Sequence, residues 1–152
     1  MSNPKRFNAD RSRELAKQVR ALPHECYHNA VMSLVWLPDD AFYVEGWLAR
    51  IIPIEHGWIE LGDEIFDPTL PDGDAVYFSG PRYARGVVLR AINRGTLDLP
   101  IVYGRGRGLK ALRRGFGGLE SDEYRHAMEE AQRLLYGGTV AEYMAQLSRL
   151  KA

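Results

Sequence analysis

The amino-acid sequence predicts an α+β fold in a single domain over residues 1–152. Helical segments come first, short aromatic and β-branched segments then follow one another, and helical segments return near the C-terminus. This order differs from the alternating strands and helices of parallel nucleotide-binding sheets, and it favours an antiparallel sheet packed against helices. A chain of 152 residues can bury one hydrophobic core and is too short for two comfortable domains.

Two helices are expected before the sheet. The first covers residues 11–22, is capped by Asn8 or Asp10, and ends at Pro23 because proline does not continue a helix. The second covers residues 26–37, where apolar residues recur at helical spacing. Its start, so soon after the proline, is sharply defined.

The sheet is expected to consist of short strands separated by turns. Runs rich in β-branched and aromatic residues predict strands at 41–51, 54–61 and 64–70, with a tight turn at Gly62-Asp63 between the last two. Beyond them the sequence predicts a strand at 75–79, a helix at 81–93, an edge strand at 97–104, and C-terminal helices within 121–150 that are capped by Ser121 and Thr139.

Charge and composition narrow the classes of function. The 20 basic and 20 acidic residues cancel, so the net charge indicates no polyelectrolyte partner. The N-terminus has no apolar signal-peptide core, and no segment approaches the roughly 20 apolar residues of a membrane span. A single cysteine forms no internal disulfide, which favours a reducing compartment. We therefore expect a cytoplasmic protein without membrane association; no cofactor and no particular oligomeric state are indicated.

The stretch HECYH at residues 24–28 admits two interpretations, because it matches the H-E-x-x-H pattern of zinc peptidases and also contains the only cysteine. A zinc site needs both histidines on one face of an established helix, with a third ligand such as Glu45 arriving from elsewhere. Pro23 stands directly before His24, so His24 and His28 would lie across a helix end. A zinc hydrolase is kept as an alternative, but no metal is expected.

The same helix start suits a nucleophilic thiol at Cys26. A cysteine in the first turn experiences the positive end of the helix dipole and the unpaired backbone N–H groups, which favour the thiolate. A thiol nucleophile also needs a base and a group that orients the base. His56 and Asp67 are the candidates for these two roles.

The hairpin around Gly62-Asp63 predicts that the base and its partner lie together. A two-residue loop there puts Trp58 opposite Asp67. It also puts His56 opposite Thr69, so that His56 and Asp67 are diagonal neighbours on one face, roughly 7–8 Å apart along the backbone. An imidazole and a carboxylate can close that gap, whereas contact with the second helix is only assumed. Taken singly, each residue also has an ordinary structural explanation, as a buried thiol, a strand histidine or a turn aspartate.

Four blocks of the sequence resemble a known superfamily. The segments ECYHNAVMSL, YVEGWLA, IEHGWIEL and IFDPTL are similar to the cysteine, histidine and aspartate blocks of papain-like and transglutaminase-like cysteine enzymes, especially small bacterial and phage members. The resemblance covers residues 22–70. It implies a papain-like core, in which a nucleophile-bearing helix packs on an antiparallel sheet. It also implies that Cys26 is the nucleophile, His56 the base and Asp67 the group that orients the base.

Other residues of this core are expected to support the site, namely Asn29, Trp58 and Thr69. The oxyanion hole departs from the family pattern. Papain-like enzymes usually carry a glutamine a few residues before the cysteine, whereas the nearest upstream glutamine here is Gln18, in the preceding helix. The backbone N–H of Cys26 would then act together with a second donor that the sequence does not identify.

A basic, glycine-rich loop is expected at residues 104–118, in a stretch without acidic residues between Asp98 and Glu120. Clustered cations bind phosphates or an acidic partner through charge and forked hydrogen bonds. Only Tyr103 and Phe116 are available to stack on bases, so nucleic-acid binding has weak support and a solvated loop is the ordinary alternative. The five cations are Arg105, Arg107, Lys110, Arg113 and Arg114.

Together these features predict a cysteine-dependent acyl-transfer enzyme that acts on an amide of a protein or peptide substrate. Peptidase, amidase, deamidase and transglutaminase reactions differ only in leaving group and acceptor, and the sequence does not separate them. The alternatives are a zinc hydrolase that uses HECYH and a non-catalytic binding module that uses the Arg-Gly loop.

Overall fold

The computed structural model describes residues 5–50, 52–101, 121–136, 145 and 149. In this part of the chain the elements are, in order, β1 (Arg6–Phe7), α1 (Ala9–Val19), α2 (Cys26–Ser33), the 3₁₀ helix η1 (Leu34–Trp36), β2 (Phe42–Ala49), β3 (Pro53–Leu61), β4 (Glu64–Phe66), β5 (Val76–Ala84), α3 (Arg85–Asn93) and α4 (Asp122–Tyr136). The predicted α+β class is therefore confirmed.

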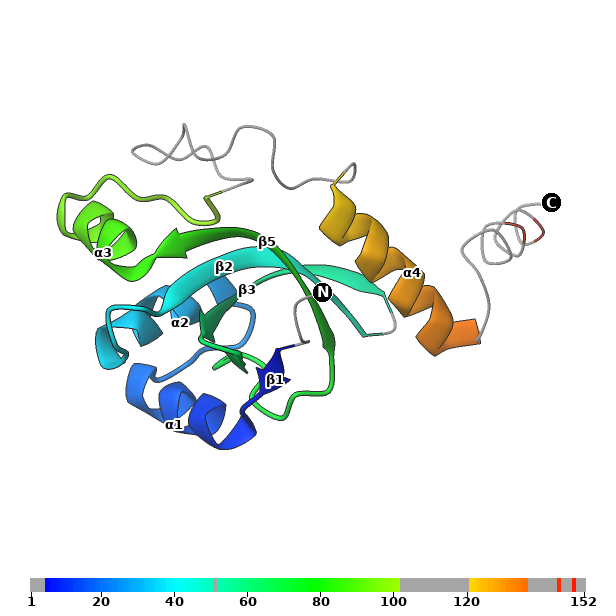
Figure 1. Cartoon of the computed structure of the whole chain (residues 1–152), viewed down its shortest axis with the longest axis horizontal. Helices are drawn as coiled ribbons and strands as arrows, with labels where there is room; N and C mark the ends of the chain where they lie inside the picture. The colour runs from blue at the N-terminus through cyan, green and yellow to red at the C-terminus, as the bar shows by residue number, and fades with distance from the viewer. Residues whose placement is uncertain (1–4, 51, 102–120, 137–144, 146–148, 150–152) are drawn as a thin grey trace.

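The strands form one sheet in the order β1-β4-β3-β2-β5 (Figure 1). β1 pairs with β4 in parallel, and the other neighbouring strands are antiparallel. β2 is thus flanked on both sides by long strands, and β5 lies at one edge. No helix in the described part of the chain is both long enough and apolar enough to cross a membrane.

The hairpin of β3 and β4 has the predicted register next to its turn. Leu61 pairs with Glu64 and Ile59 pairs with Phe66, while Gly62 adopts a left-handed φ of 58°. The pairing stops at Phe66, however, so the predicted strand to residue 70 and the pairing of His56 with Thr69 are wrong. Proline at position 68 has no N–H to donate, and the next two backbone N–H groups bond to the side chain of the preceding aspartate instead.

The two N-terminal helices begin close to the predicted residues, but both end earlier than predicted. Asn8 caps α1 by accepting a hydrogen bond from the N–H of Arg11. The helix ends at Val19, because Arg20 turns into the left-handed conformation and its N–H bonds back to the preceding carbonyls. α2 begins at Cys26 as predicted, but its last turn tightens into η1 instead of continuing as α-helix to residue 37.

The segment after the hairpin corrects the prediction most. β5 continues through Pro81 to Ala84, so α3 begins at Arg85 and not at residue 81. Proline fits there because β5 is an edge strand, and its register with β2 shifts between Val44 and Gly46, as at a β-bulge.

The predicted edge strand at 97–104 is absent from residues 97–101, and 102–104 lie outside the described residues. α4 forms as predicted, with the Ser121 hydroxyl accepting a hydrogen bond from the N–H of Tyr124. Of the predicted last helix, only Ala145 and Arg149 are described, and both are helical.

Alternate residues of the sheet face two apolar clusters. Tyr43 and Ile59 pack with Leu15 of α1 and with Ala30 and Leu34 of the second helical segment. On the opposite face, residues of β2, β3 and β4 pack against one another and against partly buried aromatic rings; this cluster comprises Val44, Trp58, Ile65, Phe7 and Tyr77. α4 packs on β2 and β5, as Figure 1 shows at the end of the sheet away from α3. Successive residues of β3 therefore reach two different environments.

Candidate active site

Asp67 lies at the end of β4 and is completely buried. Its Oδ2 bonds to His56 Nε2 at 2.8 Å and accepts a hydrogen bond from the Tyr77 hydroxyl at 2.5 Å. Its Oδ1 accepts hydrogen bonds from the backbone N–H groups of Thr69 and Leu70, at 3.0 and 3.1 Å. Each carboxylate oxygen therefore has two partners, and the side chain is fixed in one orientation.

These partners keep Asp67 ionised. Burial by itself would raise the pKa of this carboxyl, because a low dielectric disfavours charge. The hydrogen bond and positive charge of His56, the Tyr77 hydroxyl and the N–H of Leu70 outweigh burial and lower the pKa below its ordinary value. The backbone N–H of Asp67 also donates to the Ser12 hydroxyl at 2.9 Å, which ties the site to α1.

His56 lies on β3 and is 4% exposed. Burial alone would lower the pKa of the imidazole, but the hydrogen bond to Asp67 and the charges of Asp67 and Cys26 raise it to about 9. The ring also stacks on Trp58, with centroids 6.3 Å apart and planes inclined by 23°. His56 is thus held as an imidazolium between a carboxylate and a thiol.

Cys26 is the first residue of α2 and is partly exposed. Its thiol lies near enough to His56 to raise the pKa of that imidazole, while Nε2 of the ring is bonded to Asp67. Gly57 makes this approach of helix and strand possible, because a Cβ there would lie 2.8 Å from Cδ1 of Tyr27. His56 and Asp67 are therefore joined by a hydrogen bond, and Cys26 influences the pKa of the imidazole from the start of α2.

Asn29 hydrogen-bonds to the segment that precedes α2. Its Oδ1 accepts a hydrogen bond from the N–H of Leu22 at 3.2 Å, and its Nδ2 donates to the Leu22 carbonyl at 2.8 Å. The same Nδ2 donates to the Thr69 hydroxyl at 2.9 Å. Asn29 is 1% exposed, so this amide connects the chain before the cysteine with the chain after the aspartate from a buried position.

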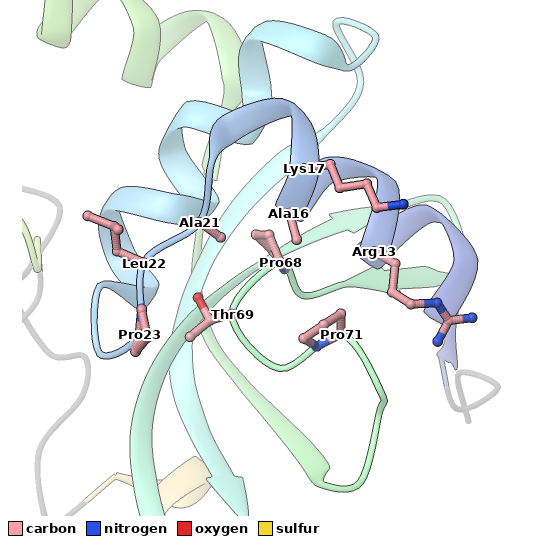
Figure 2. A pocket seen from close by; sticks show the side chains of 9 residues that line it. All are labelled: Arg13, Ala16, Lys17, Ala21, Leu22, Pro23, Pro68, Thr69 and Pro71. Atoms are coloured by element: carbon pink, nitrogen blue, oxygen red, sulfur yellow. The ribbon is translucent and has the colours of Figure 1, made fainter.

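A hollow of about 440 Å³ lies beside this connection, between α1, the Leu22-Pro23 segment and residues 68–71 (Figure 2). Alanine, leucine and proline side chains make up most of its lining, and Arg13 and Lys17 extend from α1 at its edge, as Figure 2 shows. The Thr69 side chain also lines it. An apolar side chain of a peptide is the type of group that this lining accommodates.

Carboxylates and phenols gather on the other face of β3. The Tyr27 hydroxyl donates a hydrogen bond to Glu55, and the Tyr43 hydroxyl donates one to Glu45 Oε2 at 2.6 Å. Burial raises the pKa of both phenols well above the ordinary value, and the neighbouring glutamates and Cys26 raise it further. Cys26 therefore influences both the imidazole of His56 and these phenols.

The histidines of the HECYH stretch are arranged differently from a zinc pair. His24 has a left-handed φ of 65° and precedes the helix, whereas His28 lies within it, and both are exposed. Among the described residues, no group of three or more histidine, cysteine, aspartate or glutamate side chains is arranged to hold a metal ion. This geometry disfavours the zinc alternative.

Sequence reasoning missed Tyr77, Ser12, Tyr27 and Glu55 as neighbours of the site. Tyr27 and Glu55 stand next to Cys26 and His56 in the sequence, and this adjacency is the signal that could have found them. The positions of Tyr77 and Ser12 depend on how distant segments pack. The five predicted cations of the Arg-Gly loop, at 105, 107, 110, 113 and 114, lie outside the described residues.

Comparison with known proteins adds no relative: no protein-family model, no curated protein and no solved structure matches the chain.

Proposed function

We propose that this protein is a cysteine-dependent acyl-transfer enzyme that acts on an amide of a protein or peptide. The observations that carry the proposal are the buried hydrogen bond between His56 and Asp67 and the position of Cys26 at the start of α2, close enough to affect the pKa of the imidazole. A nucleophile next to a base, with the base oriented by a third group, is the arrangement that nucleophilic catalysis requires. The resemblance of residues 22–70 to papain-like and transglutaminase-like enzymes supports the same roles and a papain-like core.

In the proposed reaction the Cys26 thiolate attacks the carbonyl carbon of the amide and forms a C–S bond. His56, held as imidazolium, gives its proton to the leaving nitrogen as the C–N bond breaks. The thioester is then attacked by water or an amine, whose proton returns to His56, and the Cys26 thiolate leaves. Asp67 keeps the imidazole in one orientation and stabilises its positive charge throughout.

The oxyanion of the tetrahedral intermediate needs hydrogen-bond donors. Cys26 begins α2, and the first N–H groups of a helix have no partner within the helix, so the backbone N–H of Cys26 is suited to this role. The dipole of the helix favours negative charge at the same end. The hollow beside Thr69 and Pro23 is suited to an apolar side chain of the substrate. A reducing location such as the cytoplasm is proposed as well, because the nucleophile must remain a free thiol.

The test is the reactivity of Cys26, which is the only cysteine in the chain. With p-nitrophenyl acetate, we expect a burst of nitrophenolate and an acetyl group on Cys26, detected by mass spectrometry of the intact protein. His56→Ala should reduce the burst rate at pH 7 by about 100-fold or more, because the Cys26 thiolate loses the imidazolium that holds its proton and stabilises its charge. His28→Ala is the matched control, since it removes an exposed histidine from the same helix, and its burst should be unchanged.

The proposal fails if folded wild-type protein is not acylated, or if His56→Ala and wild type react at the same rate. Circular dichroism and thermal unfolding of each variant separate loss of reactivity from loss of fold.

A further inference from the structure

The carboxylate of Glu55 lies on the cysteine side of the sheet. Glu55 directly precedes His56 on β3, and successive residues of a strand face opposite sides. It therefore shares a face with Gly57, against which the start of α2 packs, while His56 faces Asp67. On β2, Trp47 is its partner directly across the pair of strands.

A phenol holds this carboxylate beside the thiol. The Tyr27 hydroxyl donates a hydrogen bond to Glu55 Oε1, and Tyr27 directly follows Cys26. The charges of Glu55 and Cys26 both act on the phenol of Tyr27. The side chain of Glu55 is thus anchored through one oxygen, within the surroundings of the candidate nucleophile.

The other oxygen of Glu55 is available to a ligand. Within the described part of the chain, Oε2 has no hydrogen-bond partner and the carboxylate forms no ion pair, although Glu55 is only partly buried. Partial exposure means that an incoming group can reach it. A half-buried carboxylate binds an ammonium or guanidinium group through a charge-assisted hydrogen bond, and it repels an anionic group.

We propose that Glu55 determines the specificity of the acyl transfer by binding a positively charged group of the substrate close to the reacting amide. This inference rests on the proposed function, because it takes Cys26 as the reacting thiol. It names the substrate class: peptides or proteins with a lysine, arginine or free amino group near the amide that is cleaved or transferred.

Charged thiol reagents test this without knowledge of the substrate. The cationic 2-(trimethylammonium)ethyl and the anionic 2-sulfonatoethyl methanethiosulfonates both form a mixed disulfide with the Cys26 thiolate and release methanesulfinate. At pH 8 and low ionic strength, the ratio of cationic to anionic rate constants should fall about fourfold in Glu55→Gln, as expected for one charge within about 10 Å of the thiol in water. Glu55→Asp keeps the charge and should retain most of the preference. In 1 M salt, where the Debye length is about 3 Å, the wild-type preference should shrink towards that of Glu55→Gln.

Two carboxylates serve as comparisons. Glu25 is exposed and directly precedes Cys26, whereas Glu64 bonds to Asn8 at the far end of the hairpin. The inference is overturned if Glu55→Gln leaves the ratio unchanged, or if Glu64→Gln lowers it as much; Glu25→Gln removes a charge next to the thiol and gauges how large the effect of a nearby carboxylate is. Glu64→Gln should behave as wild type.

The neutral reagent iodoacetamide separates this test from the proposed function. His56→Ala should slow this alkylation, which tests the proposed function, whereas the role of Glu55 is read only from the ratio of the two charged reagents, in which a change of overall reactivity cancels. A protein whose thiol shows no dependence on His56 but still prefers the cationic reagent would refute the acyl-transfer proposal and leave the charge effect of Glu55 intact.

Discussion

Replacing Asp67 by asparagine removes the charge that holds His56 protonated while keeping the shape of the side chain. The asparagine Oδ1 can still accept hydrogen bonds from the N–H groups of Thr69 and Leu70. Its Nδ2, however, faces His56 Nε2 with a donor in place of an acceptor. A neutral imidazole would then carry its proton on Nδ1 and keep Nε2 as acceptor from the asparagine, so neither ring nitrogen would be free to accept the proton of the thiol.

The size of the effect follows from the pKa of His56, which is raised from the ordinary 6.5 to about 9. Burial is the largest single influence on this imidazole, and it favours the neutral form. Without the carboxylate, the pKa should fall to 6.5 or below. At about 1.4 kcal/mol for each pKa unit, the imidazolium loses about 3–4 kcal/mol of stabilisation, or roughly 300-fold in its protonation equilibrium.

The assay is the pH dependence of Cys26 alkylation by iodoacetamide between pH 5 and 9, together with NMR titration of the His56 ring. In wild type the ring should titrate near pH 9, and alkylation near pH 6 should exceed that of the unfolded protein. In Asp67→Asn both features should be lost, with alkylation near pH 6 reduced about 100-fold. Asp63→Asn, in the exposed turn of the same hairpin, is the control for general effects of removing a carboxylate.

An Asp67→Asn protein that is folded, and whose His56 still titrates near pH 9, would refute the reasoning. Burial and the thiol alone would then account for the behaviour of the imidazole.

Three further outcomes are expected. Gly57→Ala should lower the free energy of unfolding by about 1–3 kcal/mol and slow Cys26 alkylation, because the new Cβ meets the ring of Tyr27. Urea denaturation and alkylation rates measure the two effects. Unchanged values of both would contradict the described packing. Tyr77→Phe should lower the free energy of unfolding by about 1–2 kcal/mol, because it removes one hydrogen-bond donor to Asp67. It should slow Cys26 alkylation less than Asp67→Asn does. An equal loss would show that the charge of Asp67 is not what controls the reactivity of Cys26. The stability difference between wild type and Asp67→Asn should depend on pH. The raised pKa of His56 contributes stability that is fully present below pH 6.5 and is lost as pH rises through 9. The lowered pKa of Asp67 contributes stability that is present above pH 3.8 and is lost as pH falls. The difference should therefore be largest near pH 5 and smaller at pH 9 in urea denaturation, and growth with pH would oppose this account.

Local chemistry explains which parts of the fold were predictable. The turn at Gly62-Asp63 sets the pairing of neighbouring residues, so the start of the hairpin was predicted with the correct register. Alternation along β3 then placed His56 and Asp67 on one face, and they do form a hydrogen bond. The predicted pairing failed from Asp67 onward, so Trp58 does not pair with Asp67, because Pro68 has no N–H and the Asp67 side chain bonds the next two backbone N–H groups.

Long-range packing explains what was missed. The Tyr77 hydroxyl bonds to Asp67 although β5, which carries Tyr77, pairs with β2 and not with β4. No local sequence pattern predicts this hydrogen bond. Pro81 suggested the first turn of a helix, yet an edge strand with a shifted register accommodates proline equally well. The meeting of Cys26 with His56 likewise depends on how α2 docks on the sheet, which the sequence alone left as an assumption.

The triplet His56-Gly57-Trp58 has a consequence for recognising such sites in other chains. The three residues serve the two faces of the strand: the imidazole bonds to the carboxylate and stacks on the indole on one face, and the glycine lets Tyr27 at the start of α2 approach on the other. A chain with a bulkier middle residue would have to hold its helix farther from the strand. A histidine followed by glycine and a large aromatic residue, downstream of a cysteine that opens a helix, is therefore a compact signature that sequence searches can use where overall similarity is too low to detect.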